Sequence, residues 1–134
     1  MGARYREMEI RTATPEMLIV KLYEGALRFI AVAKAAHQTG RLQDRGNGVS
    51  RALAIVAELQ QSLNMEIGGD ISQNLDALYM FITEKLLEAN VQGREESFDE
   101  ASSVLSELHS AWVEIARNPP DLAEAEATLA RIQR

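Results

Sequence analysis

The chain has no cysteine among its 134 residues, and it has only two histidines and three prolines. The lack of cysteine excludes disulfide bonds, thiol catalysis and zinc sites built from thiolates, and it is compatible with a reducing cytoplasm. No apolar run reaches the roughly 18 residues that a membrane-spanning helix needs. The first residues also lack the apolar core of a signal peptide, so we expect a cytoplasmic protein with no membrane insertion.

Signals for β-strands are equally scarce, because no segment alternates polar and apolar residues and no turn dipeptide separates two apolar segments. Apolar residues instead recur every three or four positions, which is typical of amphipathic helices. The spacing predicts helices over 15–37, 49–66, 70 or 71–91 and 95–117, with a short fifth helix from 121. The polar segment 40–48, which contains three glycines, is expected to be a connection.

The short connections favour antiparallel packing of successive helices. We therefore predict an all-α fold, an antiparallel up-down four-helix bundle in a single domain. An N-terminal arm (1–14), the bundle (15–117) and a C-terminal appendage (118–134) would make up the chain.

The segment Thr12-Ala13-Thr14-Pro15 predicts a sharp helix start, with Thr14 as the N-cap and Pro15 at the first helical position. The helix that follows is more apolar than a single buried face requires. Tyr23 and Tyr79 are expected at the edge of the core, with their hydroxyl groups in water, and Trp112 is expected to pack in the core. The surplus of apolar residues predicts either contact with the arm or fifth helix, or a groove for a partner helix.

The net charge of −6 is unevenly distributed, since residues 1–50 have a balance of +3 and residues 51–134 a balance of −9. Nucleic-acid binding is disfavoured because it needs a concentrated basic face. The acidic half has three interpretations, which are solvated helix faces, a docking surface for a basic partner, and a means of keeping an apolar binder soluble.

Catalytic patterns are absent, so we expect no catalytic residues, no metal site, no cofactor and no enzyme activity. A di-metal bundle needs Glu-x-x-His pairs, but Lys34 and Ser106 stand three residues before His37 and His109. Gly68-Gly69 has no P-loop context. A histidine phosphotransfer module using His37 and a helical adaptor with a different partner remain alternative functions.

The order of several short motifs resembles that of the flagellar secretion chaperone FliS family, over residues 5–115. These motifs are Tyr5-x4-Ile10-x-Thr12-Ala13-Thr14-Pro15, Leu22-Tyr23-Glu24-Gly25-Ala26, Ser62-Leu63-Asn64-x-Glu66-x-Gly68-Gly69-Asp70-Ile71, Leu86-x2-Ala89-Asn90 and Leu105-x2-Leu108-x2-Ala111-Trp112. Thr14 replaces the serine that the family usually has, and it is an equivalent cap.

The resemblance implies a cytoplasmic export chaperone that binds the disordered C-terminal segment of flagellin, prevents premature polymerisation and delivers it to the flagellar type III export apparatus. It also implies an arm that lies on the bundle and moves on client binding, with Tyr5 and Ile10 as apolar contacts and Thr12 to Pro15 as a hinge. Outer apolar positions of the first three helices are expected to bind the client, among them Leu18, Leu22, Tyr23, Ile55, Leu59, Leu75, Tyr79 and Ile82. Periodicity leaves open which of these positions belong to the core instead.

Overall fold

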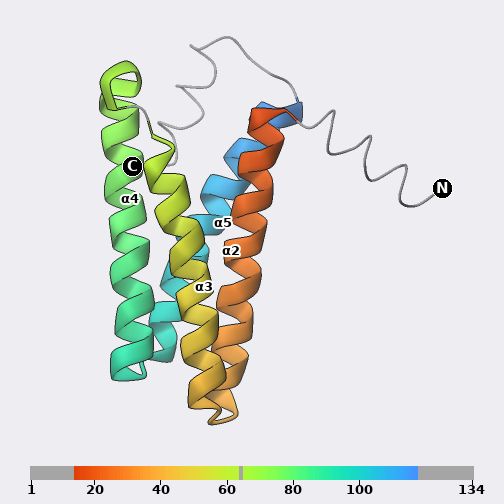
Figure 1. Cartoon of the computed structure of the whole chain (residues 1–134), viewed down its shortest axis with the longest axis vertical. Helices are drawn as coiled ribbons and strands as arrows, with labels where there is room; N and C mark the ends of the chain where they lie inside the picture. Colours follow the sequence, from red (N-terminus) through yellow and green to blue (C-terminus); the bar gives the residue numbers. More distant parts are fainter. Residues whose placement is uncertain (1–13, 64, 118–134) are drawn as a thin grey trace, which may run out of the picture.

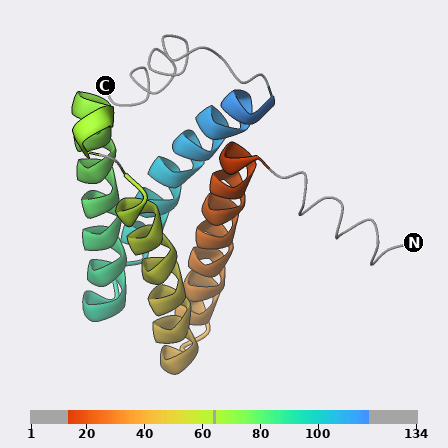
Figure 2. The same ribbon diagram turned by 45° about the horizontal axis from the view of Figure 1, so that its top comes forward.

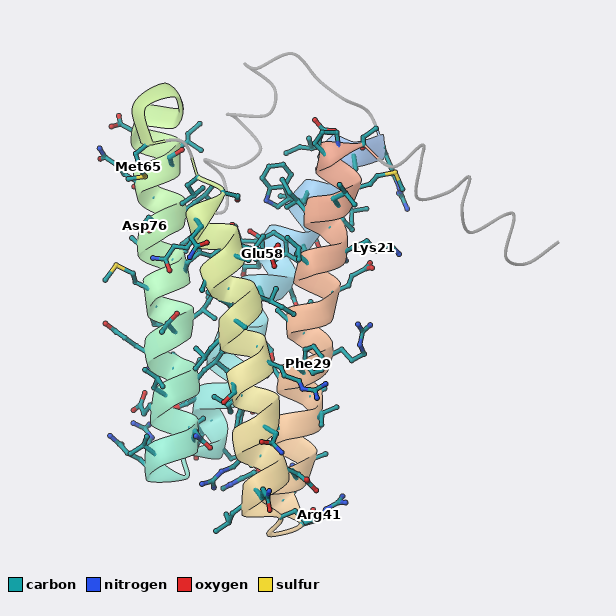
Figure 3. The ribbon with its side chains drawn as sticks, viewed as in Figure 1. Lys21, Phe29, Arg41, Glu58, Met65 and Asp76 are labelled. Carbon is teal, nitrogen blue, oxygen red and sulfur yellow. The ribbon has the colours of Figure 1, made fainter. Side chains whose placement is uncertain are left out.

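The computed structural model describes residues 14–63 and 65–117, and these ranges form four α-helices and no β-strand. The helices are α2 (Pro15–Gln38), α3 (Leu42–Gln61), α4 (Met65–Gln92) and α5 (Glu95–Arg117). They lie side by side, and the chain reverses direction at each connection (Figures 1 and 2). Helix α2 packs against α3 and α5, and α4 packs against the same two helices, with the side chains shown in Figure 3. The expected four-helix bundle is confirmed, while the arm and the fifth helix lie outside the described residues.

Helix α2 begins and ends where the sequence indicates. The Thr14 hydroxyl accepts a hydrogen bond of 3.2 Å from the backbone N–H of Met17, and Pro15 occupies the first helical position. This satisfies one of the N–H groups that have no partner within the helix. Gly40 follows the helix with a φ of 74°, a left-handed conformation that favours glycine.

Helix α3 corrects the expected connection over 40–48, because the helix already begins at Leu42. Gly48 lies inside it and is buried against α2. A Cβ atom at this position would lie 3.0 Å from the Ala33 Cβ and 3.1 Å from the Phe29 carbonyl oxygen. The glycine therefore serves close helix packing and does not mark a turn. The helix also ends at Gln61, earlier than the expected residue 66.

Helix α4 contains a break near the start that the sequence predicts. Gly69 has a φ of 53° and a ψ of −129°, so the uninterrupted helix runs from the residue after it to Gln92. Gly93, with a φ of 69°, separates α4 from α5. The bounds of α5 are those predicted.

The core lies between the four helices, and each helix contributes residues at spacings of three and four. Its largest fully buried side chains are Tyr23, Ile30, Val49, Val56, Leu59, Tyr79, Ile82, Leu86, Phe98, Leu105 and Leu108. Burying one Leu-sized side chain stabilises a fold by about 1.5–3 kcal/mol, so this set is the main source of stability.

Polar contacts join α3 to α4 at the end of the bundle where α4 finishes. Arg45 of α3 donates to the side-chain oxygen of Asn90 at 3.3 Å and to the Asn90 carbonyl at 2.7 Å. Arg45 also lies 3.0 Å from Nδ1 of His37. Since a guanidinium only donates, this ring nitrogen is the acceptor.

Candidate functional site

The eight residues predicted to bind a client fall into two groups in the structure. Tyr23, Leu59, Leu75, Tyr79 and Ile82 are at most 3% exposed and belong to the core, so their expected place on an outer face is wrong. Leu18 is 54% exposed, and Leu22 and Ile55 are half-buried. Spacing alone did not separate the groups, because α2 and α3 each have apolar residues on the core face and beside it.

Tyr23 and Tyr79 lie inside the core and not at its edge, where the sequence predicts them. The hydroxyl groups of Tyr23 and Tyr79 are hydrogen-bonded to each other inside the core, with ring centroids 6.4 Å apart. Each ring therefore satisfies the polar group of the other without water. Burial raises the pKa of both tyrosines above the ordinary value, so both stay protonated.

Three of these core residues line an apolar pocket at the end of the bundle where α2 begins. The pocket has a volume of about 210 Å³, and residues of all four helices form it. Its walls are Ile19, Leu59, Ser62, Leu63, Ile71, Ser72, Leu75, Tyr79 and Trp112. Trp112 is only partly buried, and it packs against the core from this side. Such a pocket can accept an apolar side chain of a partner.

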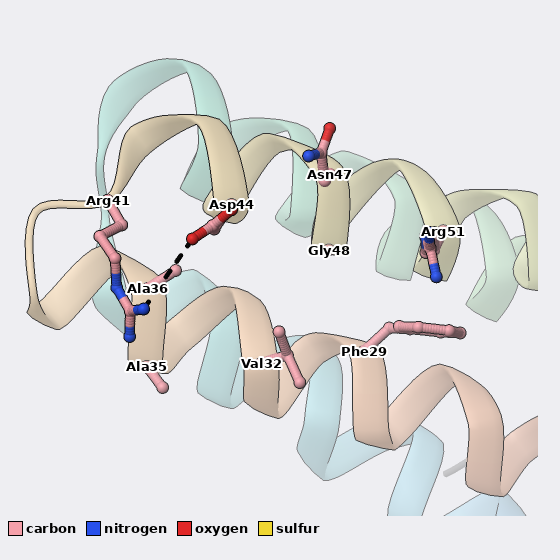
Figure 4. Close-up of a pocket in the computed structure, with 9 residues that line it drawn as sticks. All are labelled: Phe29, Val32, Ala35, Ala36, Arg41, Asp44, Asn47, Gly48 and Arg51. Atoms are coloured by element: carbon pink, nitrogen blue, oxygen red, sulfur yellow. Dashed lines mark ion pairs between the residues drawn. The ribbon is translucent and has the colours of Figure 1, made fainter.

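A groove of about 340 Å³ lies between α2 and α3, further along the bundle (Figure 4). Its α2 side is apolar and includes Phe29 and Val32, while its α3 side includes Arg41, Asp44 and Arg51. The guanidinium of Arg51 lies 5.5 Å from the centroid of the Phe29 ring, within the range of a cation–π contact. The groove thus combines an apolar wall with a polar rim, which fits an amphipathic segment.

The start of α2 exposes further apolar surface, as the composition of this helix predicts. Met17 is 39% exposed, and Val32 at the other end of the helix is 51% exposed. A further pocket of about 350 Å³ separates the start of α2 from the end of α5, with Met17, Val20, Val113 and Ala116 among its walls. The surplus of apolar residues on α2 is therefore real surface within the described part of the chain.

In the part of the chain that the structure describes, each histidine contacts residues of a neighbouring helix. His37 lies in the last turn of α2, partly buried between Arg45 and the ring of Phe98. His109 lies 3.1 Å from a carboxylate oxygen of Glu24. Within 14–63 and 65–117 there is no cluster of histidine and acidic residues that could hold a metal ion. His37 is thus not the exposed mid-helix histidine that phosphotransfer would require.

These features define a helical bundle that offers apolar binding surface and no assembled catalytic group in the described ranges. In those same ranges, the helices are too short or too polar to cross a bilayer. The chemistry available to such a surface is the binding of an apolar or amphipathic polypeptide.

Comparison with known proteins agrees with this class. The family described as Flagellar protein FliS matches residues 1–119. The Flagellar secretion chaperone FliS of Vibrio cholerae is 32% identical over 120 residues, covering 90% of this chain and 88% of the relative. The Campylobacter jejuni protein of the same name is 35% identical over 114 residues (85% and 89%), and the Salmonella typhimurium protein is 31% identical over 111 residues (82% of each).

The chain belongs to the FliS family. This is a family of flagellar secretion chaperones and not of enzymes, which confirms the resemblance seen in the sequence and the expectation that the chain is not an enzyme. A flagellar protein is therefore the class of partner.

Proposed function

We propose that this chain binds the disordered C-terminal segment of flagellin in the bacterial cytoplasm, prevents its premature polymerisation and delivers it to the flagellar type III export apparatus. The main support is family membership together with apolar surface on α2 that the bundle does not cover. A client segment that buries its apolar face on this surface cannot use that face to contact another flagellin.

The proposed contact surface consists of the exposed and half-buried positions Leu18, Leu22 and Ile55, with the pocket at the end of the bundle. Leu59, Leu75 and Tyr79 would contact a client side chain only as walls of that pocket. Tyr23 and Ile82 would act from the core by holding this surface in place. Ile55 of α3 packs over Gly25 of α2, since a Cβ atom built on this glycine would lie 3.2 Å from the Ile55 Cδ1. Its side chain therefore covers the contact between α2 and α3 and belongs to the proposed contact surface.

The N-terminal arm would cover part of this surface in the free protein, with Tyr5 and Ile10 as its apolar contacts. The segment Thr12 to Pro15 would be the hinge, because Thr14 and Pro15 fix the point at which the rigid helix begins. Deletion of residues 1–11 is then expected to leave helix content unchanged and to increase the binding of a hydrophobic dye. Unchanged dye binding would contradict this role of the arm.

Titration calorimetry with a peptide of the flagellin C-terminal segment tests the proposal. We expect saturable binding, so that the bound segment is not available for flagellin polymerisation. A soluble, unstructured peptide that gives no binding signal by calorimetry or by anisotropy would refute the proposed client. Binding to a different protein, with none to flagellin, would instead select the adaptor function.

A further inference from the structure

Helix α4 exposes a second row of residues that is separate from its core face. Its members are spaced alternately four and three residues apart, and all of them are exposed: Gln73, Ala77, Met80, Glu84, Leu87 and Val91. Met80 is 52% exposed, Leu87 45% and Val91 78%. Alternating spacings of three and four are typical of a helix that packs along another helix. We call these six residues the outer row.

The fold does not need the outer row. The core face of α4 has the same spacing and is made of Leu75, Tyr79, Ile82, Leu86 and Ala89, all of which are buried. Helix α4 packs with this core face against α3 and α5. Figure 1 shows α4 at one side of the bundle and α2 at the opposite side. Within residues 14–63 and 65–117, the three large apolar side chains of the outer row are therefore not used for packing the bundle.

Acidic residues predominate on the two helices that carry and flank the outer row, α4 and α5. Residues 70–117 contain ten acidic and three basic residues, whereas residues 14–63 contain four acidic and six basic residues. Glu84 lies in the middle of the row, and no described cation forms an ion pair with it. A carboxylate at the centre of an apolar contact needs a cationic partner.

The nearby cations are already engaged. Lys85 lies 3.2 Å from a Glu88 carboxylate oxygen and 3.1 Å from one of Glu100. Arg94 lies 2.6 Å from the other oxygen of Glu88. These pairs leave Glu84 as the acidic group that a bound partner would meet.

We propose that the outer row is a docking surface for a basic amphipathic helix of a second partner protein. Apolar residues of that helix, spaced by three and four, would pack on Met80, Leu87 and Val91, and a lysine or arginine would face Glu84. The client surface proposed above lies on α2, on α3 and at the end of the bundle, so both partners can be bound at once. A second copy of this chain fits poorly, because it would bring two acidic rows together.

The test uses two synthetic peptides of about 18 residues with identical leucines at three-four spacing, in which the flanking positions are lysine in one and glutamate in the other. The lysine peptide is expected to bind the full-length protein saturably, and added salt should weaken it. Leu87→Ser should weaken binding of the lysine peptide roughly fivefold, because a partner can bury about half of this side chain. Glu84→Lys should also weaken it and should create binding of the glutamate peptide. Leu42→Ser, at an exposed apolar position on α3 outside the proposed client surface, is the matched control and should change neither titration.

Any one of five results would overturn the proposal. Two of them are absence of binding by the lysine peptide and equal binding of both peptides. A third is undiminished binding of the lysine peptide by a Leu87→Ser variant that keeps the wild-type circular dichroism spectrum. A fourth is a dimer in sedimentation equilibrium that Leu87→Ser dissociates. The last result would assign the row to a second copy. A flagellin peptide that binds less well to Leu87→Ser would equally overturn it, because the row would then belong to the client surface.

Discussion

The hydroxyl group of Tyr23 on α2 is hydrogen-bonded to that of Tyr79 on α4, so that a polar contact crosses the apolar core between the two helices on one diagonal of the bundle. Both rings are at most 2% exposed, and neither hydroxyl can turn to water without opening the core. Tyr79 also forms one wall of the pocket at the end of the bundle where α2 begins.

Removing one hydroxyl group of this pair is expected to destabilise the fold more than half as much as removing both. Tyr79→Phe leaves the Tyr23 hydroxyl buried without its Tyr79 partner, and we expect a loss of about 1–3 kcal/mol in the free energy of unfolding. The double variant Tyr23→Phe/Tyr79→Phe removes both polar groups and should be destabilised by less than the sum of the single variants. Urea unfolding of the four proteins measures the coupling, and additive losses would show that the two hydroxyls act independently.

Two glycines on α3 predict opposite effects of the same substitution. Gly48→Ala places a Cβ atom 3.0 Å from the Ala33 Cβ and 3.1 Å from the Phe29 carbonyl oxygen, so α2 and α3 must separate. Overpacking of this kind costs about 1–3 kcal/mol, which exceeds the gain in helix propensity of about 1 kcal/mol.

Gly46→Ala is the matched control, because its nearest neighbour is the Asn90 side chain at 3.9 Å. This variant should gain up to about 1 kcal/mol from helix propensity alone. Thermal or urea unfolding distinguishes the two, and a stabilised Gly48→Ala variant would contradict the close approach of the helices.

The pair of Glu24 and His109, which joins α2 to α5, predicts a dependence of stability on acid. The hydrogen bond from His109 holds the pKa of the Glu24 carboxyl below its ordinary value of 4.5. A lowered pKa in the folded state means that the stabilisation is present above that value and is lost as the pH falls through the folded-state pKa. The effect should be small, since both groups are partly exposed.

His109→Ala should therefore reduce the fall in melting temperature between about pH 6 and about pH 3 relative to the wild type. Glu114→Gln, an exposed position on the same helix, serves as the control and should leave the difference unchanged. Identical acid sensitivity in the wild type and His109→Ala would show that the pair contributes nothing in this range.

Substitutions on two faces should separate the client surface from the outer row. Leu18 is 54% exposed, so a client can bury about half of it, which corresponds to about 1 kcal/mol or roughly a fivefold change in Kd. Leu18→Ser should weaken binding of the flagellin peptide by this factor, while Leu87→Ser should not. The two variants are matched in chemistry and differ only in the face of the bundle, so equal affinity for the peptide would remove Leu18 from the client surface.

Local signals in the sequence predicted the elements well where a single residue decides the backbone. Thr14 and Pro15 predicted the start of α2, because a cap and a fixed φ depend on few neighbours. Gly48 led to a wrong prediction, a connection over 40–48, because its role depends on a neighbouring helix. A glycine that admits a neighbouring helix and a glycine that ends a helix look alike until the neighbour is known.

The sequence by itself determined that the chain is helical, that its four helices form an antiparallel bundle, that α2 has more apolar surface than one core face needs, and that the motifs are those of the FliS family. Only the tertiary structure decided which apolar residues are core and which are surface. Tyr23 and Leu18 both lie on α2 at apolar positions, yet one is fully buried against Tyr79 and the other is exposed. The reason is physical: periodicity gives the angle of a side chain around its own helix, whereas burial depends on where the other helices lie around that axis.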